Sequence, residues 1–293
     1  MSNYDVFHFF WGVSLWGFWR WHLLDLPLLR GLGKRVIVHF RGLDIVDIST
    51  FDRARDSGRS ELAGVRLDSR PDQLKKLRWW RQWANELLVS EPDLWDLVPE
   101  AVLSPQVIDL GAWMRRSPAV VGDEVVVVHA PTNRRKKGTE FVIEACATLR
   151  EKGLPVRLQL IEGMPYSEVR QAYEGADIAV DQVLYGWHGK FSLEMMAMGV
   201  PVVCFIRDDL LHVRPDLPVA NARAGNLADV LEVLVREPER RRRLAEAGPG
   251  YVKRYHSLEV ILDQLEALYG LREPAEIAPH WLNPAHRSAG HRG

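Results

Sequence analysis

Short apolar runs rich in valine and isoleucine alternate along the chain with longer segments whose apolar residues recur every three or four positions. The runs are typical of buried strands, and the longer segments of amphipathic helices. Ser90 is expected to cap a short helix in which Pro92 takes the second position. In the first 110 residues the pattern predicts strands at 6–10, 35–40, 86–89 and 102–103, a helix ending at 29–30, and another at 72–85.

The same pattern is more regular in the second half of the chain. Strands are predicted at 124–131, 156–161 and 178–183, and helices at 139–152, 166–175, 227–236, 238–247 and 258–269. Strands that alternate with helices indicate a doubly wound parallel sheet, with ligands at the carboxyl ends of the strands. We therefore expect an α/β protein with domains at 1–110 and 111–270, and a disordered tail at 271–293.

The stretch 176–203 combines a strand, a glycine loop and a helix. Gly186 and Gly189 open the loop, and the helix is predicted to begin near Phe191. Backbone N–H groups at such a helix start can bind a phosphate, since glycine lets the backbone approach a ligand closely. Glu194, expected in the first turn, would lie beside the phosphates and accept hydrogen bonds from a sugar diol. The alternative is an ordinary α/β unit whose glycines only form a turn.

A basic loop at 133–138 follows the strongest predicted strand. Lys137, Arg134 and Arg135 are candidates for phosphate binding, because this loop and the glycine loop both follow strands of one parallel sheet. The alternative is a run of like charges on a solvated loop. His188 is either a phosphate contact or an ordinary loop residue.

Aromatic residues are concentrated in the segment 7–29. This segment lacks the basic start and the small-residue cleavage site of a secretory signal. Arg20, His22 and Asp25 interrupt it, and such side chains are costly in the hydrocarbon of a membrane. We interpret the segment as core structure. The alternative is contact with a membrane surface through Trp11, Trp16, Trp19 and Trp21.

Charge and cysteine content argue against several classes of protein. The 293 residues carry 38 basic and 39 acidic side chains, a formal net charge of -1, which argues against a nucleic-acid-binding protein. Cys146 and Cys204 lie in apolar runs and are interpreted as buried reduced thiols of a cytoplasmic protein. His280, His286 and His291 lack metal-ligand spacing, so no metal site is predicted.

Two motifs in the second half resemble those of retaining GT-B glycosyltransferases of the E-x(7)-E type, the group 1 or family 4-like enzymes. HAPTNRRKKGTEFVIEA, from His129, is similar to the first loop and helix of their donor domain, and GWHGKFSLEMMAMGVPVV, from Gly186, to their glutamate motif. Residues 4–110 resemble the later part of the family's N-terminal domain through YDVFH, VHFRGLDI, ELLVSEPDL and SPQVIDLGAW. The resemblance implies two Rossmann-like domains facing across a cleft, the N-terminal one incomplete.

The resemblance also implies roles for charged residues of these motifs. Glu194 falls on the second glutamate, which holds the ribose hydroxyls of the donor. Lys137 falls on the lysine that meets the donor diphosphate. Pro131 stands where the family has an arginine, so Arg134 or Arg135 would supply that charge.

Gly186 takes the place of the motif's first glutamate, so the carboxylate that usually faces the donor sugar is missing. In the N-terminal half, His8 remains a catalytic candidate, with Arg41 and Asp44 in the loop after the next strand, while Phe10 replaces the family's second histidine. The rest of the glycine loop is expected to contact the donor through His188, Gly189, Lys190, Phe191 and Ser192.

The implied activity is transfer of a sugar from a nucleoside-diphosphate donor to a saccharide, lipid-linked or small-molecule acceptor. The family implies retention, and catalysis without a bound metal or cofactor. Two alternatives stay open: a non-catalytic nucleotide-sugar-binding module or subunit completed by a partner, and a sugar-nucleotide epimerase. A cytoplasmic location is expected, with weak contact at the inner face of the membrane as a further alternative.

The chain begins at what resembles the fourth strand of the family's N-terminal domain. We therefore expect the first sheet to have an unpaired edge beside partly uncovered apolar residues. Such an edge favours self-association and, with an incomplete domain, weak transfer activity. The residues expected to be uncovered are Phe7, Phe9, Trp11, Trp16 and Trp19.

Overall fold

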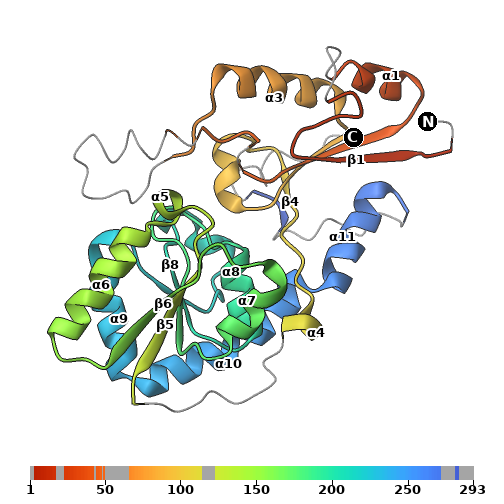
Figure 1. The fold of residues 1–293 in the computed structure, drawn as a ribbon. Coiled ribbons are helices and arrows are strands. Elements are labelled where there is room, and N and C mark those ends of the chain that lie inside the picture. The colour runs from red at the N-terminus through yellow and green to blue at the C-terminus, as the bar shows by residue number, and fades with distance from the viewer. Residues whose placement is uncertain are drawn as a thin grey trace. The chain divides into compact units, whose positions relative to one another are not determined.

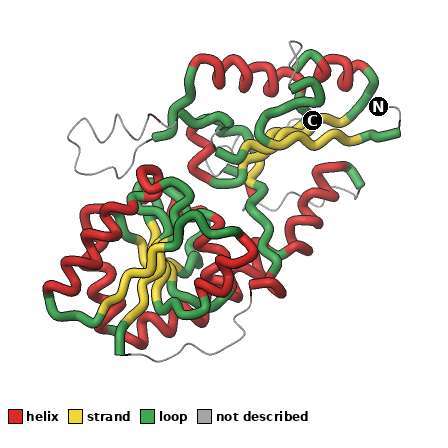
Figure 2. Tube along the Cα trace, in the orientation of Figure 1, coloured by secondary structure: helices red, strands yellow, loops and turns green. Residues whose placement is uncertain are grey.

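The computed structural model describes residues 3–17, 23–42, 44–47, 49, 66–113, 123–271 and 281–283. These residues form two compact units, each built on a parallel sheet (Figure 1, Figure 2). Unit 1 takes its described residues from Met1–Asp52, Arg66–Gln106 and Glu259–Gly293, and unit 2 takes its own from Val107–Leu258.

The sheet of unit 1 has four parallel strands in the order β1-β2-β3-β4. They are β1 Val6–Phe10, β2 Arg35–Phe40, β3 Glu86–Val89 and β4 Val102–Leu103, which confirms the four predicted strands. In β2, Val36, Ile37 and Val38 are fully buried, as expected for a parallel strand covered on both faces. The helices are α1 Asp25–Gly31, α3 Pro71–Trp83, the 3-10 helix η1 Pro92–Asp96 and α11 Leu258–Tyr269.

Opposite faces of β1 contact different helices, because side chains alternate along a strand. The Phe9 ring packs on Trp80 of α3, with ring centroids 5.4 Å apart. The neighbouring His8 meets Tyr269 of α11, with 2.7 Å between its Nδ1 atom and the tyrosine oxygen. The sheet therefore lies between α3 and α11.

Among the described strands, β1 lies at the edge of its sheet. Trp11 and Trp16, which follow β1, are exposed as predicted. Phe9 is buried, contrary to prediction, because α3 covers it. Phe7 is half-buried, and Trp19 lies outside the described residues.

The sheet of unit 2 has five parallel strands in the order β6-β5-β7-β8-β9. They are β5 Val125–His129, β6 Val156–Leu160, β7 Ile178–Val180, β8 Val202–Cys204 and β9 Val219–Asn221. The longer helices are α6 Thr139–Glu151, α7 Tyr166–Tyr173, α8 Lys190–Ala197, α9 Leu227–Arg236 and α10 Pro238–His256. Shorter ones are α4 Leu110–Trp113, α5 Arg134–Lys137, η2 Asp208–Val213 and η3 Ala224–Asn226.

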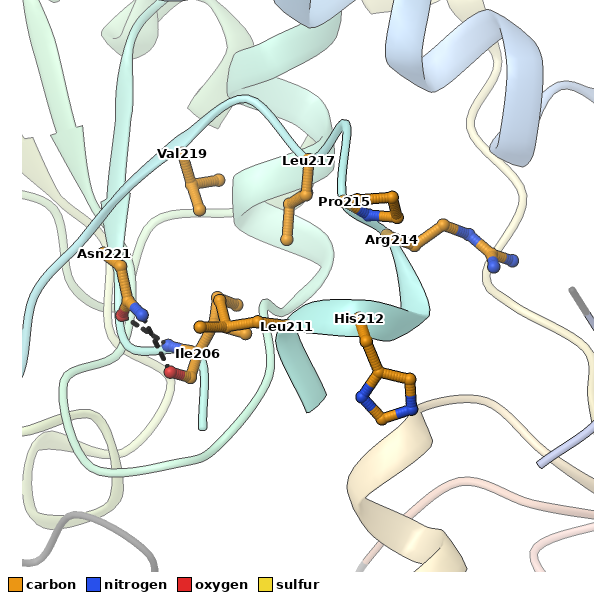
Figure 3. Close-up of a pocket in the computed structure, with 8 residues that line it drawn as sticks. All are labelled: Ile206, Leu211, His212, Arg214, Pro215, Leu217, Val219 and Asn221. Carbon is orange, nitrogen blue, oxygen red and sulfur yellow. Dashed lines mark hydrogen bonds between the residues drawn. The ribbon is translucent and has the colours of Figure 1, made fainter. Parts of the chain in front are cut away.

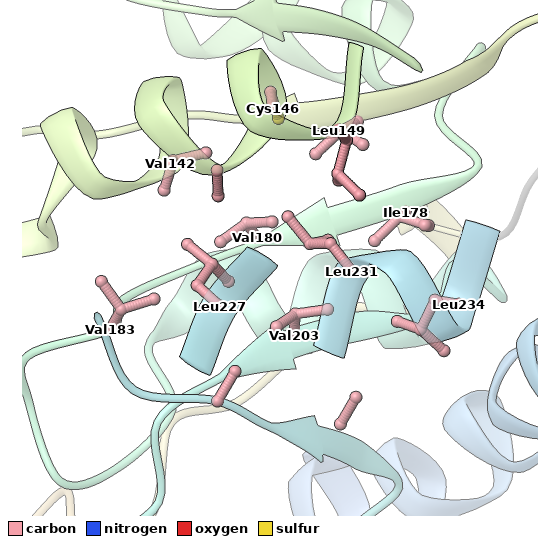
Figure 4. Packing of buried hydrophobic residues seen from close by; sticks show 14 of the residues in the cluster. Val142, Cys146, Leu149, Ile178, Val180, Val183, Val203, Leu227, Leu231 and Leu234 are labelled. Atoms are coloured by element: carbon pink, nitrogen blue, oxygen red, sulfur yellow. The ribbon is translucent and has the colours of Figure 1, made fainter. Parts of the chain in front are cut away.

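Aliphatic side chains of α6 and α9 pack together over the strands of this sheet (Figure 4). Leu149 of α6 and Leu231 of α9 are fully buried against Val180 and Val203 of the strands. The buried thiol of Cys146 belongs to the same cluster, and burial raises its pKa to about 11. Both cysteines are free and buried, as predicted.

Helix α10 continues to His256, nine residues past the predicted end at Ala247. The predicted end lies directly before the Gly248-Pro249-Gly250 sequence, but tertiary packing continues the helix through these residues. A Cβ at position 248 would lie 2.7 Å from the Met196 carbonyl oxygen, so glycine permits close contact between α10 and α8. Tyr251 and His256 are buried beyond it, and their burial favours continuation of the helix.

Two further positions differ from the predictions. The N-cap of η1 is Glu91 with Pro92 at the first position, because the Ser90 N–H still pairs with the Phe40 carbonyl in the sheet. From Glu259 onward α11 belongs to unit 1 and not to the predicted domain 111–270. Its Gln264 side chain donates a 2.7 Å hydrogen bond to the carbonyl of Leu103 in β4.

Candidate functional site

The loop between β7 and α8 is organised around the carboxylate of Asp181, which follows the end of the strand directly. Asp181 Oδ2 accepts hydrogen bonds from the Gly189 N–H at 2.8 Å and from the Ser192 hydroxyl at 2.7 Å. Asp181 Oδ1 accepts a hydrogen bond from Lys137 Nζ at 2.6 Å. Two loops that follow neighbouring strands are thus joined at one buried carboxylate, which is 1% exposed.

The basic loop contains one turn of helix, α5, instead of the predicted irregular loop. The Asn133 side chain caps this turn by accepting from the Lys136 N–H at 3.0 Å. Gly138 ends it with φ of 75°, and a Cβ there would lie 2.5 Å from Val183. This close contact with the β7–α8 loop holds Lys137 next to Asp181.

The charges of this pair are stabilised by their surroundings. Burial acts to raise the pKa of Asp181, but the Lys137 ammonium and the hydrogen bonds from Ser192 and Gly189 outweigh it and lower that pKa below its usual value. Asp181 is therefore ionised at neutral pH. Lys137 Nζ also contacts Gln182 Oε1 at 3.1 Å, and its side chain is 13% exposed, so solvent reaches part of it.

Glu194 lies in the second turn of α8 and not in the first as predicted, because the helix begins at Lys190. Its Oε1 atom accepts a hydrogen bond from the Tyr166 hydroxyl at 2.8 Å and lies 3.6 Å from Lys190 Nζ. The carboxylate is buried, and burial raises its pKa. Lys190 also lies over the Tyr166 ring, 4.6 Å from its centroid.

The other predicted residues of the glycine loop have mainly internal partners. The Phe191 ring is buried against Tyr173. Gly186 lies beneath Arg207, whose Cδ would be 3.0 Å from a Cβ at that position. The Arg207 guanidinium is buried and forms an ion pair with Asp209 at 2.8 Å.

His188 points into the protein and contacts α10. Its ring lies 6.4 Å from Tyr251 and 5.7 Å from His256, measured between ring centroids. Both ring nitrogens are buried, and neither has a hydrogen-bond partner in the part of the chain that the structure describes. Burial lowers the pKa of His188 to about 4, so the imidazole is neutral at pH 7. This orientation favours a packing role over a direct phosphate contact.

The two arginines before Lys137 are exposed. Arg134 forms ion pairs with Glu140 at 3.2 Å and with Glu162 at 3.3 Å. Exposed pairs of this kind are weak and exchange readily, so Arg134 can turn toward a ligand at little cost. Arg135 is exposed on the same short helix.

The N-terminal candidates form a separate group in unit 1. His8 and His39 stack at 5.8 Å between ring centroids, and the Nε2 atom of each is buried without a partner among the described residues. Burial and the nearby Arg41 lower the pKa of His8 to about 4 and of His39 to about 3. Asp44 accepts from the Arg41 N–H at 3.1 Å, and burial raises its pKa.

Four polar residues were not predicted from the sequence. Asp181, Tyr166 and Arg207 belong to the group around the β7–α8 loop, and His39 belongs to the group in unit 1. Asp181 and His39 carried a usable signal, since each is a polar residue at the carboxyl end of an apolar strand. Tyr166 and Arg207 carried none. They meet Glu194 and Gly186 only through the fold.

A separate pocket of about 380 Å³ lies beside β9 in unit 2 (Figure 3). Ile206, Leu211 and Val219 give it an aliphatic lining. In Figure 3 the His212 and Arg214 side chains point away from these residues. The lining still includes His212, Arg214 and Asn221, so it combines aliphatic and polar side chains.

Within the part of the chain that the structure describes, no group of three or more His, Cys, Asp or Glu side chains is placed to hold a metal ion. The described helices include none with the length and apolar character needed to cross a membrane.

Comparison with protein-family models and with curated proteins gives no match. Solved structures do match. Sucrose-phosphate synthase from Thermosynechococcus elongatus aligns with 92% of this chain and 74% of its own, at 18% identity and a TM-score of 0.65. HepE from Anabaena, in complex with UDP-glucose, aligns with 85% of this chain and 75% of its own, at 11% identity and a TM-score of 0.58.

TarM from S. aureus, solved with alpha-GlcNAc-glycerol and UDP among its ligands, aligns with 83% of this chain and 58% of its own, at 13% identity and a TM-score of 0.57. Sequence identities this low show the fold alone. The fold is that of GT-B glycosyltransferases, with two Rossmann-like units, as the sequence motifs predict.

Proposed function

We propose that this chain is a glycosyltransferase that moves a sugar, with retention, from a nucleoside-diphosphate donor to an acceptor. The observation that carries the proposal is the meeting of Lys137 and Gly189 at the N-terminus of α8. A Cβ at Gly189 would lie 3.0 Å from Lys137 Nζ. The ammonium group and the start of the helix thus lie together at the carboxyl edge of a parallel sheet, where such folds bind ligands.

Each group has a role in this reaction. The first-turn amides of α8 have no acceptor within the helix, so they and Lys137 can bind the diphosphate. As the bond to the sugar breaks, negative charge builds on the leaving diphosphate, and these fixed positive groups stabilise it. Glu194, in the second turn of α8, accepts hydrogen bonds from the ribose hydroxyls. The exposed Arg134 and Arg135 add charge from the solvent side.

Two solved neighbours support the choice of donor. HepE has been solved with UDP-glucose and TarM with UDP. Both are similar to this chain only in fold, and they support a nucleoside diphosphate as the shared ligand chemistry. For the acceptor we propose unit 1, where His8 and His39 are neutral and the Nε2 atom of each has no hydrogen-bond partner among the described residues.

A second candidate function is a nucleotide-sugar-binding module without catalysis. It is favoured by Gly186, which offers no carboxylate to the donor sugar, and by the stem of Arg207 that packs over it. Both candidates predict donor binding. They differ in turnover.

Donor binding is tested by calorimetry with UDP-, GDP- and ADP-sugars on the wild-type chain and on Glu194→Ala. The variant loses charge-assisted hydrogen bonds to the ribose, so we expect affinity about tenfold to a hundredfold lower. Glu168→Ala, an exposed carboxylate of α7, is the matched control and should bind as the wild type does. Equal affinities of Glu194→Ala and wild type would contradict the assignment.

A further inference from the structure

The Asp181 carboxylate accepts hydrogen bonds from three groups in different parts of the proposed nucleotide-sugar site. Its Oδ1 atom accepts a hydrogen bond from Lys137 of α5. Its Oδ2 atom accepts hydrogen bonds from the Gly189 N–H and the Ser192 hydroxyl at the start of α8. Lys137 and Gly189 reach the carboxylate from two loops that follow paired strands, β5 and β7. Asp181 therefore fixes the position of one loop relative to the other.

The arrangement leaves little freedom for substitution. An ammonium group and a backbone N–H can only donate hydrogen bonds, so both oxygens of Asp181 are required as acceptors. An asparagine offers one oxygen and would turn its NH₂ toward either Lys137 or Gly189. Gly189 is equally constrained, because a Cβ there would lie 3.0 Å from both Asp181 Oδ2 and Lys137 Nζ.

We infer that Asp181 is a positioning residue for the donor diphosphate: it holds the Lys137 ammonium beside the N-terminus of α8. The inference rests on the proposed function. Asp181 is 1% exposed, so it does not itself touch a donor phosphate. It acts through Lys137, whose side chain remains partly open to solvent.

Burial explains why a carboxylate is needed for this role. A partly buried ammonium without a partner is costly, and its side chain would turn toward water when no donor is bound. Asp181 offsets that charge, so Lys137 keeps the same position with and without a ligand. Such pre-organisation strengthens binding because less conformational freedom is lost when the ligand arrives.

The test is a double-mutant cycle on UDP affinity, measured by calorimetry on wild type, Asp181→Asn, Lys137→Ala and the double variant. Asp181→Asn should weaken UDP binding about tenfold or more and change uridine binding by less than about twofold. In the Lys137→Ala background the same substitution should change UDP affinity by less than about twofold, since its effect passes through the lysine.

Asp177→Asn is the matched control. Asp177 directly precedes β7 and accepts a hydrogen bond from the Val126 N–H at 2.8 Å, so it supports the same strand at the end opposite to the loop. We expect unchanged UDP affinity. If Asp181→Asn does not fold, Ser192→Ala and Gly189→Ala replace it. The first should give a milder loss of UDP affinity and the second a larger one, both dependent on Lys137.

Three outcomes would overturn the inference. Equal losses in the wild-type and Lys137→Ala backgrounds would mean that Asp181 only supports the fold. Unchanged or tighter UDP binding by Asp181→Asn would mean that its charge opposes the phosphates. A wild-type chain that binds no nucleoside diphosphate would overturn the proposed function as well, which separates the two failures.

Discussion

Both units are built on a parallel sheet, but the polar groups at the two sheets differ: they are neutral in unit 1 and charged in unit 2. In unit 1 the polar groups on β1 and β2 are the stacked histidines His8 and His39, which burial keeps neutral. In unit 2 the corresponding loops hold an ion pair, Lys137 and Asp181, at 2.6 Å. Both sets are buried or half-buried, and both lie on parallel strands or in the segments that follow them.

The difference indicates how each unit meets its ligand. A neutral imidazole with an unpartnered nitrogen suits a hydroxyl group, which carries no charge. A fixed ammonium beside a helix start suits a phosphate. Under the proposed function, the anionic part of the reaction would fall to unit 2 and the uncharged acceptor to unit 1. The predictions below separate these two roles.

The largest effect is expected from Lys137→Ala. Loss of the ammonium should weaken UDP binding about tenfold to a hundredfold, while uridine, which has no phosphates, binds as before. Calorimetry with both ligands measures this. Lys136→Ala is the control, since Lys136 lies over the Tyr185 ring, 4.4 Å from its centroid.

Equal losses for UDP and uridine would show Lys137 to be a surface charge without a phosphate contact. The exposed arginines sharpen the same test. Arg134→Ala and Arg135→Ala should each be milder than the double variant, because either guanidinium can supply part of the charge.

A smaller effect is expected from His39→Gln, on acid stability. The pKa of His39 is lowered from 6.5 to about 3 in the folded protein, so between these values the unfolded chain binds more protons. Stability therefore falls as pH drops below 6.5, by about 2 kcal/mol between pH 6.5 and about pH 5. His39→Gln should remove this loss, although glutamine lowers stability at neutral pH.

Hydrogen exchange of the β2 amides at both pH values measures the change. His212→Gln, an exposed histidine of unit 2, is the control. If β2 in His39→Gln loses as much protection in acid as the wild type does, His39 is not held neutral by burial, and the contrast between the units fails.

The smallest effect is expected from Glu194→Gln, and it concerns the stability of the folded protein at neutral pH. Burial raises the pKa of Glu194, so the folded protein binds more protons than the unfolded chain, and the ionised form destabilises the fold at neutral pH. The glutamine side chain can still accept a hydrogen bond from the Tyr166 hydroxyl. Thermal unfolding at pH 7 should show a modest gain in stability, alongside weaker donor binding. A loss of stability would mean that ionised Glu194 is well compensated.

Much of the fold was predictable because apolar periodicity reports burial directly. The strands of unit 1 and the helices 227–236 and 258–269 were predicted at their observed residues. Errors arose where tertiary packing decided the outcome. Helix α10 passes through Gly248 and Pro249 because α8 packs against it, and three-residue β9 has too few residues to show a pattern.

The candidate site was predictable in part. Lys137 and Gly189 were predicted as site residues from their places after strands, and the structure brings the two together. The carboxylate that joins them, Asp181, was not predicted: its place after a strand was a usable signal, but nothing in the spacing relates it to Lys137, 44 residues earlier. His188 and Phe191 were predicted to contact the donor, but their rings are buried and pack against aromatic neighbours.

The most direct test of the account is turnover. The chain is incubated with UDP-, GDP- and ADP-sugars, with and without a set of saccharide, lipid-linked and small-molecule acceptors, and release of nucleoside diphosphate is followed. The account predicts release with at least one donor that depends on an acceptor and is lost in Lys137→Ala. Donor binding with no acceptor-dependent release from any combination would contradict catalysis and support a nucleotide-sugar-binding module.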